Sequence, residues 1–491
     1  MKNFLSYGLV FLGLLGFQNS LAAQTKTASE KSDEPSQTAP NPKKEKLTIV
    51  GRVQFRGVSG QIDSSFNNGH RDFNSVDWNF RRVRFGFNYD GASWWGVVVQ
   101  LRVEDAINRP YVTVRRDPVT NQLTDVQIND NRGILQEANI HLQSSSLFSR
   151  ITFGQSTVPF FREFHGASSA NLINVERSMM TQSMGQFDLG VKYGFKPLGF
   201  FDKLKENHLV IEVGIYNGRG SGLDGMGRRQ VLTDDMNSSR PILISPMYAA
   251  RAQWNVFGGL KDDSGKDIGW REGDEIFQKE AKLSLGIAHL YTKEFTQINR
   301  LDPNIRDYPT WTIFTPQTTP SGGNTWNVLN NNTQTSPYRR NFDLHATTVD
   351  ATFTWNGYYL NSAFVKTAGL ASNSMESYQG TFGYNFSINE YFLMPVIRAD
   401  YIQADSNRNN RIDDFERIRN YWAGLVFFGD RHLLKMQLFY SRMGDRLGFD
   451  PSTGNRMDAR NDLVIFQLQG TFWTGPSSTE TKIPTRDDIT D

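Results

Sequence analysis

The sequence predicts an all-β fold, a transmembrane antiparallel β-barrel of about 16 strands with long extracellular loops and an inward-folded third loop. Three observations predict it. Apolar and polar residues alternate with a period of two in segment after segment, as in strands with one apolar and one polar face. The connections between these segments alternate between long and short. Aromatic residues reach 13%, cysteine is absent and mean hydropathy is −0.49, a composition that suits strands with one face in water.

The chain opens with a segment typical of an export signal. Lys2 supplies the positive charge, residues 4–17 form an apolar core, and Leu21-Ala22-Ala23 resembles a cleavage region. We expect residues 1–23 to be a signal peptide. Residues 24–46 are rich in Ser, Thr, Pro and Lys and are expected to form a disordered periplasmic linker. The barrel is predicted over residues 47–473, followed by a polar C-terminal tail, residues 474–491.

Alternation begins at Leu47, where Val53 and Phe55 share one face of the first segment and Arg52 and Arg56 share the other. Asn356-Gly357 is a strong hairpin signal between two later segments. The 16 predicted strands lie near residues 47–56, 82–89, 95–104, 134–142, 149–155, 186–194, 208–216, 247–256, 280–291, 347–355, 358–366, 378–386, 395–401, 417–428, 433–443 and 462–473.

The connections predict which end of the barrel is which. The long polar ones are residues 59–77, 105–133, 156–185, 217–246, 293–342, 367–376, 405–416 and 444–461, and most of the others are tight turns. Two intervening connections, 195–207 and 257–279, are longer than a tight turn. A barrel with both termini in the periplasm has short periplasmic turns and long outer loops. We therefore expect the long loops outside, with the mixed-polarity loop 156–185 folded into the lumen.

Aromatic residues cluster at the ends of the predicted strands. Examples are Trp94-Trp95, Trp355 with Tyr358-Tyr359, Tyr421-Trp422 and Phe472-Trp473. Such residues form girdles at the two surfaces of a bilayer, because their rings can lie half in lipid and half in water.

Several short motifs support a family resemblance. They are Arg81-Arg82-Val83-Arg84-Phe85-Gly86 with residues 95–105, the run from Ile151 through Val158-Pro159-Phe160 to Val175-Glu176-Arg177-Ser178, Ile215-Tyr216-Asn217-Gly218, Val349-Asp350, and Ile397-Arg398-Ala399-Asp400-Tyr401. In these motifs the chain resembles the phosphate-selective porins O and P over nearly its whole mature length. The resemblance implies a 16-stranded trimeric barrel, an inward third loop, and an eyelet of Arg and Lys.

The inward faces of the strands carry many basic residues, and the third loop adds two more. The residues expected to line the pore and contact anions are Arg52, Arg56, Arg82, Arg84, Arg102, Arg162, Arg177, Lys192, Arg251, Lys282, Arg398 and Lys435. The planar fork of Arg suits phosphate and carboxylate. Five acidic residues share these faces: Glu104, Asp188, Glu212, Asp350 and Asp400. Opposed charges of this kind are equally explained as cross-strand pairs that stiffen the wall.

These features predict a porin of the bacterial outer membrane. It would form a water-filled channel for passive diffusion of small hydrophilic solutes, with a mild preference for anions, including phosphate-like ones. Expected partners are the solutes or anions, outer-membrane lipid and two further copies in a homotrimer. A net charge of +2 gives no overall field that would attract nucleic acid, and no cofactor is required.

Two other classes of function are compatible with a barrel. An adhesin or receptor would use the long loops 217–246 and 293–342. A barrel enzyme would need a nucleophile and a base placed together. His141 is followed by Ser144, but in no arrangement that resembles a nucleophile site. We therefore expect no catalytic activity.

Residues 405–416 match the spacing of a twelve-residue calcium loop. The candidate Ca2+ ligands are Asp405, Asn407, Asn409, Arg411 (through its carbonyl), Asp413 and Glu416. Asn410 replaces the usual glycine, and asparagine tolerates the left-handed backbone that the turn requires. The alternative is an ordinary polar loop in which Arg408 and Arg411 pair with the acids.

Overall fold

The computed structural model divides the chain into two units, Met1–Lys43 and Lys44–Asp491. The described residues all belong to the second unit and are 46–63, 70–71, 73, 75–92, 94–104, 112–116, 123–128, 135–166, 169–182, 187–217, 246–261, 270–274, 277–295, 342–368, 375–404, 412, 417–444, 448–449, 456–458 and 462–474. The expected signal peptide, linker and tail lie outside them, apart from Lys46 and Thr474. So do loops 218–245 and 296–341 and, except for Ile412, the predicted calcium loop 405–416.

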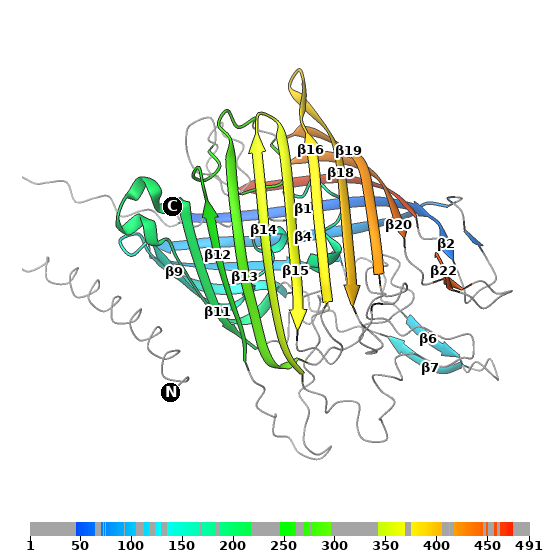
Figure 1. The fold of residues 1–491 in the computed structure, drawn as a ribbon, viewed down its shortest axis with the longest axis horizontal. Coiled ribbons are helices and arrows are strands. Elements are labelled where there is room, and N and C mark those ends of the chain that lie inside the picture. Colours follow the sequence, from blue (N-terminus) through cyan, green and yellow to red (C-terminus); the bar gives the residue numbers. More distant parts are fainter. Residues whose placement is uncertain are drawn as a thin grey trace, which may run out of the picture. The chain divides into compact units, whose positions relative to one another are not determined.

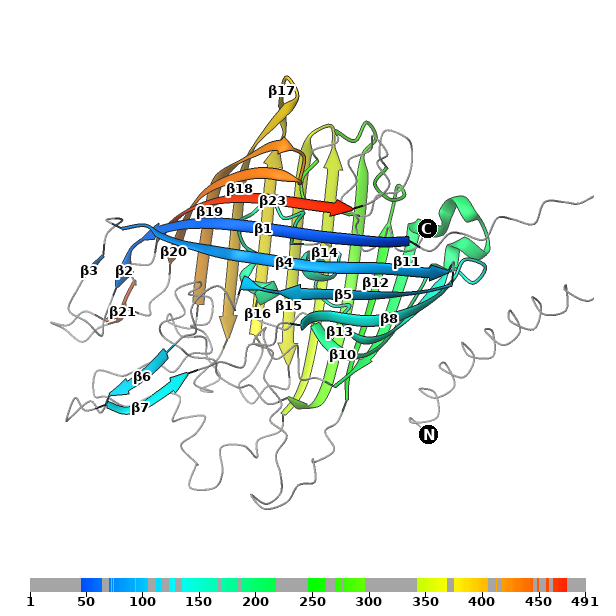
Figure 2. The same cartoon turned by 180° about the vertical axis from the view of Figure 1, so that it is seen from behind.

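Sixteen antiparallel strands form one closed barrel (Figures 1 and 2). In order around the wall they are β1 (Lys46–Gly60), β4 (Asp77–Ala92), β5 (Trp95–Arg102), β8 (Leu135–Ser144), β9 (Ser149–Thr157), β10 (Phe187–Phe195), β11 (Leu209–Tyr216), β12 (Met247–Asn255), β13 (Lys282–Phe295), β14 (Phe342–Trp355), β15 (Tyr358–Ala368), β16 (Met375–Tyr384), β18 (Tyr391–Ala404), β19 (Arg417–Asp430), β20 (Leu434–Gly444) and β23 (Leu463–Thr474). Because β23 pairs with β1, no edge strand remains in the wall. The predicted fold is confirmed.

Short strands and short helices lie outside the 16 strands of the wall. The strand β17 (Phe386–Ile388) pairs with β18, and three two-stranded ribbons are β2 (Ile62–Asp63) with β3 (His70–Arg71), β6 (Val112–Arg116) with β7 (Leu123–Ile128), and β21 (Gly448–Phe449) with β22 (Arg456–Met457). The short helices are α3 (Arg162–His165), α4 (Met179–Gln182), η1 (Pro197–Phe200) and η2 (Lys203–His208). Within the described part of the chain, no helix has the length and apolar character needed to cross a membrane.

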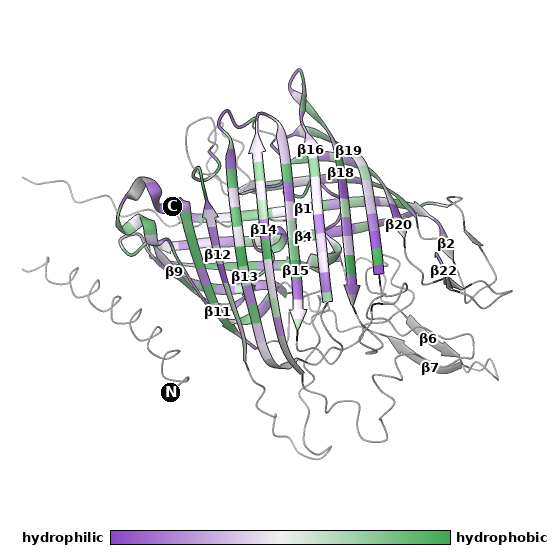
Figure 3. Ribbon diagram, in the orientation of Figure 1, coloured by the Kyte–Doolittle hydropathy of each residue, from purple (hydrophilic) through white to green (hydrophobic). Residues whose placement is uncertain are grey.

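The wall has an apolar outer face and a polar inner face. Along β20, Leu434, Met436 and Leu438 are 49%, 40% and 50% exposed, whereas Lys435 and Gln437 between them are 1% exposed. The same alternation colours the strands of Figure 3 in green and purple bands. Exposed leucine and methionine on one whole face are expected in lipid, and a closed barrel leaves no backbone group unpaired there. The protein is therefore an outer-membrane barrel.

The predicted hairpin at Asn356-Gly357 is confirmed. Trp355 pairs with Tyr358 across it. Asn356 has φ of 47° and Gly357 has φ of 90°, as a two-residue turn with two left-handed positions requires. Asparagine and glycine adopt this backbone at the lowest steric cost, so the two residues fix the register of β14 against β15.

The aromatic girdle is only partly as expected. Trp355, Tyr358, Tyr421 and Phe472 are exposed on the outer face. Trp422 faces the lumen and is buried. Tyr359 is buried in the same way. The prediction was wrong for these two because neighbours in a strand point to opposite faces, so only one residue of an adjacent pair can face lipid.

Two connections fold inward, and together they fill part of the lumen. The first is the third loop, residues 158–186, which carries α3 and α4 and whose described side chains are almost all buried. Its apolar residues pack against the inner wall in two clusters around Phe160 and Ile173. The second, here called the inward turn, connects β12 to β13, and its described residues are 256–261, 270–274 and 277–281. From the sequence, this connection is notable only for being longer than a tight turn. The structure shows that it enters the barrel.

Candidate functional site

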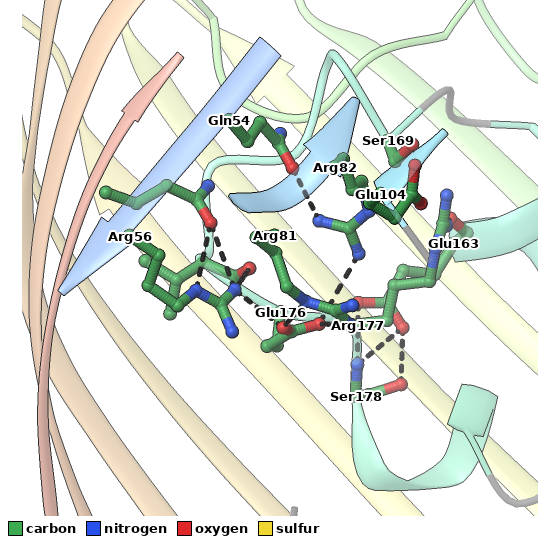
Figure 4. Close-up of polar contacts among 12 residues, drawn as sticks. Gln54, Arg56, Arg81, Arg82, Glu104, Glu163, Ser169, Glu176, Arg177 and Ser178 are labelled. Atoms are coloured by element: carbon green, nitrogen blue, oxygen red, sulfur yellow. Dashed lines mark hydrogen bonds and ion pairs between the residues drawn. The ribbon is translucent and has the colours of Figure 1, made fainter. Parts of the chain in front are cut away.

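The third loop places one carboxylate among three arginines of the wall (Figure 4). Arg81 bonds both oxygens of Glu176, with Nε to Oε1 and Nη2 to Oε2 at 2.9 Å. Arg56 Nη2 lies 2.6 Å from Oε1, and Arg82 Nη2 lies 3.4 Å from Oε2. The Glu176 side chain is 2% exposed. We call these four residues the Glu176 cluster.

Neutral amides hold two of these arginines from the wall side. Arg56 donates from Nε and Nη2 to Gln467 Oε1 on β23, at 3.3 and 3.0 Å. Arg82 Nη1 donates to Gln54 Oε1 on β1 at 2.8 Å. The guanidinium groups are therefore oriented by groups that carry no charge.

A second basic group lies next along the same wall. Arg52 and Arg84 both donate to the Ser169 hydroxyl of the third loop, at 2.8 and 3.0 Å. Arg84 and Arg102 each approach Glu104 Oε1, at 3.6 and 3.4 Å. Three arginines from three neighbouring strands, β1, β4 and β5, are thus gathered beside one carboxylate and one hydroxyl.

Basic residues from the other side of the barrel bind wall carboxylates. Arg251 on β12 forms a bidentate pair with Asp350 on β14, at 2.7 and 2.9 Å, and donates to Phe160 O of the loop. Arg398 on β18 pairs with Asp400 at 2.7 Å and donates to Glu176 O at 2.7 Å. Arg251 thus pairs with another strand and Arg398 with a residue of its own strand, and both also contact the third loop.

Backbone carbonyls of the third loop accept from β20. Lys435 Nζ donates to Ala170 O at 2.7 Å and to Leu172 O. Gln437 Nε2 donates to Ile173 O at 2.7 Å. These bonds hold the loop backbone against the wall independently of the Glu176 side chain.

Glu163 at α3 organises the loop internally. Its carboxylate accepts from Ser178 N at 2.8 Å, from the Ser178 hydroxyl, and from Thr181 Oγ1 at 2.6 Å. Arg177 donates to Glu163 O and its guanidinium lies over the Phe164 ring. The two ends of the loop are thereby tied together.

The inward turn meets the third loop from the opposite end of the barrel. Glu272 Oε2 accepts from Ile173 N at 2.9 Å, and its carbonyl accepts from His432 Nε2 at 3.0 Å. Arg162 of α3 lies 4.9 Å from the centre of the Trp270 ring. Two segments that are far apart in sequence thus contact each other inside the lumen.

The charge states of the loop carboxylates differ. Burial raises the pKa of Glu176, but Arg81, Arg56 and Arg82 lower it more, so its pKa lies well below the usual range. Burial and the nearby Glu163 raise the pKa of Glu272 to about 7. Glu176 is therefore ionised at physiological pH, whereas Glu272 titrates near neutrality.

The predicted site residues do not form one ring. Arg52, Arg56, Arg82, Arg84, Arg251, Arg398 and Lys435 each contact the third loop, and Arg162 and Arg177 belong to it. Lys192 pairs with Glu212 at 3.5 Å. Lys282 bonds Phe257 O and Glu280 near the inward turn. Most of the predicted cations thus bind protein groups, while their contact with anions stays a prediction.

Several residues of the site were not singled out from the sequence for a role. Glu163 and Glu176 were visible only as charges in a long loop. Gln54, Gln437 and Gln467 lie on inward faces of their strands, so parity alone could have placed them beside the arginines. The length of connection 257–279 was the only signal for the inward turn.

A small polar cavity lies between the third loop and the wall of β14 to β16. It measures about 10 Å³, space for roughly one water molecule. Arg162, Thr181, Asp350, Asn361 and Gln379 are among its lining residues. The mixture of donors and acceptors in this lining suits one buried water molecule.

One hydroxyl, one imidazole and one carboxylate lie in a row in the lumen. His165 Nδ1 is 3.2 Å from Thr157 Oγ1, and His165 Nε2 contacts Glu212. Burial lowers the pKa of His165 to about 4, although Glu212 opposes this. Thr157 is 1% exposed, so its hydroxyl is not presented to a substrate. The row therefore connects α3 to the wall.

His141 with Ser144 and the predicted calcium loop were the other candidates for a site. His141 is buried in the wall, and the hydroxyl of Ser144 contacts Ser146. Within the described ranges, no group of three His, Cys, Asp or Glu residues could hold a metal ion. The predicted calcium loop lies outside those ranges, apart from Ile412, and stays a prediction.

No family model matches the chain, and no curated protein matches it. Among solved structures it is similar to OmpF of Salmonella typhi in complex with daunomycin, with 11% identity over 87% of this chain and 97% of that one, at a TM-score of 0.46. OprB of Pseudomonas putida gives 10% identity over 87% and 94%, at 0.45. The outer-membrane channel DcaP of Acinetobacter baumannii gives 10% over 87% and 97%, at 0.43. Identities this low concern the barrel fold alone, and the resemblance to porins O and P stays a prediction.

Proposed function

We propose that this protein is a porin, a channel for passive diffusion of small hydrophilic solutes across the outer membrane. The observation that carries the proposal is the inner face of the barrel. Strands that expose leucine and methionine to lipid carry Arg, Lys, Gln, Asn and Thr inward. A polar interior with a loop folded into it is the arrangement of a channel with a constriction.

We infer a mild preference for anions, with phosphate-like ions among the solutes. Among the buried residues that the structure describes, ten are basic and nine are acidic, so the interior is nearly balanced. What supports the preference is a local gathering of arginines, where Arg52, Arg84 and Arg102 lie beside Glu104 and Ser169. Arginines gathered at a constriction bias selectivity without imposing strict specificity.

Planar-bilayer recording tests both statements. We expect stepwise current and, in a salt gradient, a reversal potential on the anion side. Arg82→Glu with Arg84→Glu should move that potential toward cations, and the milder pair Arg82→Gln with Arg84→Gln should move it less. Lys205→Glu, at a side chain that is 61% exposed in η2, is the control and should leave it unchanged.

Two results would contradict this function. A folded barrel that carries no current would favour the receptor or enzyme alternatives. A wild-type channel that already prefers cations would contradict the anion preference and the role given to the arginines.

We further propose that the barrel is a homotrimer. The contiguous strands β5, β8, β9, β10, β11 and β12 have 8 to 10 residues, whereas β1, β4, β13 and β14 have 14 to 16. A transmembrane strand needs about 9–11 residues, so this stretch of wall extends little beyond the lipid core, and we place the contact with another copy there. Native mass spectrometry in detergent should give three times the barrel mass, and a monomer would contradict the trimer.

A further inference from the structure

The Glu176 cluster has the form of an anion site with its ligand in place. Two oxygens of one carboxylate accept from three guanidinium groups, and Arg81 presents its fork to both oxygens. We propose, building on the channel function above, that Glu176 is an internal ligand of a carboxylate-binding site, and that small carboxylate solutes in the lumen compete with it for Arg56, Arg81 and Arg82. In the competing complex, a free monocarboxylate would occupy the place of the Glu176 side chain.

The site is held in shape by groups other than Glu176. Gln467 orients Arg56 and Gln54 orients Arg82. When the internal carboxylate leaves, these amides keep the guanidinium groups aimed at the same point. A binding site that is already organised loses little free energy in ordering its side chains.

Only a side chain has to move for the exchange to occur. The Glu176 backbone is anchored by Arg398, which donates to its carbonyl at 2.7 Å. Arg56 bonds the preceding carbonyl, Val175 O, at 3.0 Å, and Gln437 holds Ile173. The third loop can therefore stay in place while the carboxylate rotates away.

Charge balance favours replacement of the Glu176 carboxylate by another anion over its departure alone. The two buried guanidinium groups of Arg56 and Arg82 and the partly exposed one of Arg81 repel one another, and removing their anion without replacement is costly. An incoming carboxylate restores the charge balance and offers the same two acceptor oxygens. Chloride restores the charge but cannot accept two parallel hydrogen bonds from the Arg81 fork, which is the basis for discriminating between the two anions.

Glu176 is attached to the third loop, and this attachment sets the concentration of free carboxylate that is needed to compete with it. A tethered ligand acts at an effective concentration of about 1 mM or more, so a free carboxylate must exceed that value to displace Glu176. Removing the internal carboxylate removes this competitor. We therefore expect a variant without it to bind the same solute at least tenfold more tightly than the wild type.

The experiment compares Glu176→Ala with the wild type, using acetate as the probe and chloride at equal ionic strength as the reference. The first readout is the thermal unfolding temperature of the folded barrel in detergent, which rises when a ligand binds the native state. The second is block of the chloride current by acetate. Both should show a half-effect at acetate concentrations at least tenfold lower in Glu176→Ala than in the wild type.

Two further variants secure the comparison. Glu176→Gln keeps the side-chain volume without the charge and should also respond to acetate, which covers a failure of the alanine variant to fold. Glu280→Ala removes a carboxylate whose side chain is 81% exposed on the inward turn. It should respond to acetate as the wild type does.

The outcomes separate the two proposals. If neither Glu176 variant distinguishes acetate from chloride, or if both respond like the wild type, the internal-ligand proposal is overturned while the channel stands. If acetate raises the unfolding temperature as expected but no variant carries current, the binding site stands and the channel function fails.

Discussion

At the residue scale, strand parity was the strongest predictor of which side chains face the lumen. Arg52, Arg56 and Lys435 were assigned inward by alternation alone, and all are buried inside the barrel. Their partners could not be predicted. Glu176 and Ser169 reach them from a loop whose path depends on contacts all around the wall, and alternation contains no information about such a path.

Glu272 gives a pH dependence that can be measured. Burial and Glu163 raise its pKa to about 7 in the folded protein, above the ordinary value of 4.5. A carboxyl group with a raised folded-state pKa contributes stability that is complete below about 4.5 and is lost as pH rises through 7. We expect the unfolding temperature of the wild type to fall between pH 4.5 and 8, with a loss of up to about 3 kcal/mol from this group.

Glu272→Gln is the variant that isolates this effect. The amide oxygen of glutamine can still accept the bond from Ile173 N, so the contact between inward turn and third loop is kept while titration is removed. The decrease over that pH range should become shallower in the variant. An equal decrease in both proteins would show that the nearby Arg177 and Arg398 hold Glu272 ionised throughout.

At the element scale, the hairpins follow from local sequence, whereas the two inward segments do not. Asn356-Gly357 specifies its own turn through two left-handed residues. Connection 257–279 has no comparable local signal, because its position is set by side chains that meet partners distant in sequence. Trp270 meets Arg162 and Phe277 meets Phe392 in this way.

Asp274 is the main polar anchor of the inward turn. Its carboxylate accepts from Gly357 N at 2.7 Å and from Gln278 N at 2.9 and 3.1 Å. Asp274→Ala leaves both buried N–H groups without this acceptor, which should lower the free energy of unfolding by about 1–3 kcal/mol. The midpoint of urea unfolding in detergent measures the loss.

Asp274→Asn is the matched control for that measurement, because its amide oxygen can still accept one of the bonds. A smaller loss than that of Asp274→Ala is expected, because one of the two N–H groups keeps its acceptor. Equal losses in the two variants would assign the anchoring to the negative charge and not to the hydrogen bonds with Gly357 and Gln278.

At the scale of the whole molecule, the number of strands and their closure could be predicted, because each strand repeats the same alternation and each connection adds to the alternating lengths. The paths of the third loop and the inward turn inside the lumen could not be predicted. A barrel wall is specified strand by strand, whereas the third loop makes hydrogen bonds with β1, β4, β12, β18, β20 and β23 at once. Alternation places the arginines and the wall carboxylates that pair with them on the inner face, but it cannot place Glu176 of the third loop among the arginines.

The orientation of the barrel is the last prediction. Asn356 lies in a two-residue turn and is exposed, and such turns belong to the periplasmic end. Asn331 belongs to the long connection between β13 and β14, at the opposite ends of those strands. With no native cysteine in the chain, Asn331→Cys should react with an impermeant maleimide on intact cells. Asn356→Cys should react only after the outer membrane is opened, and labelling of both from outside would contradict the topology.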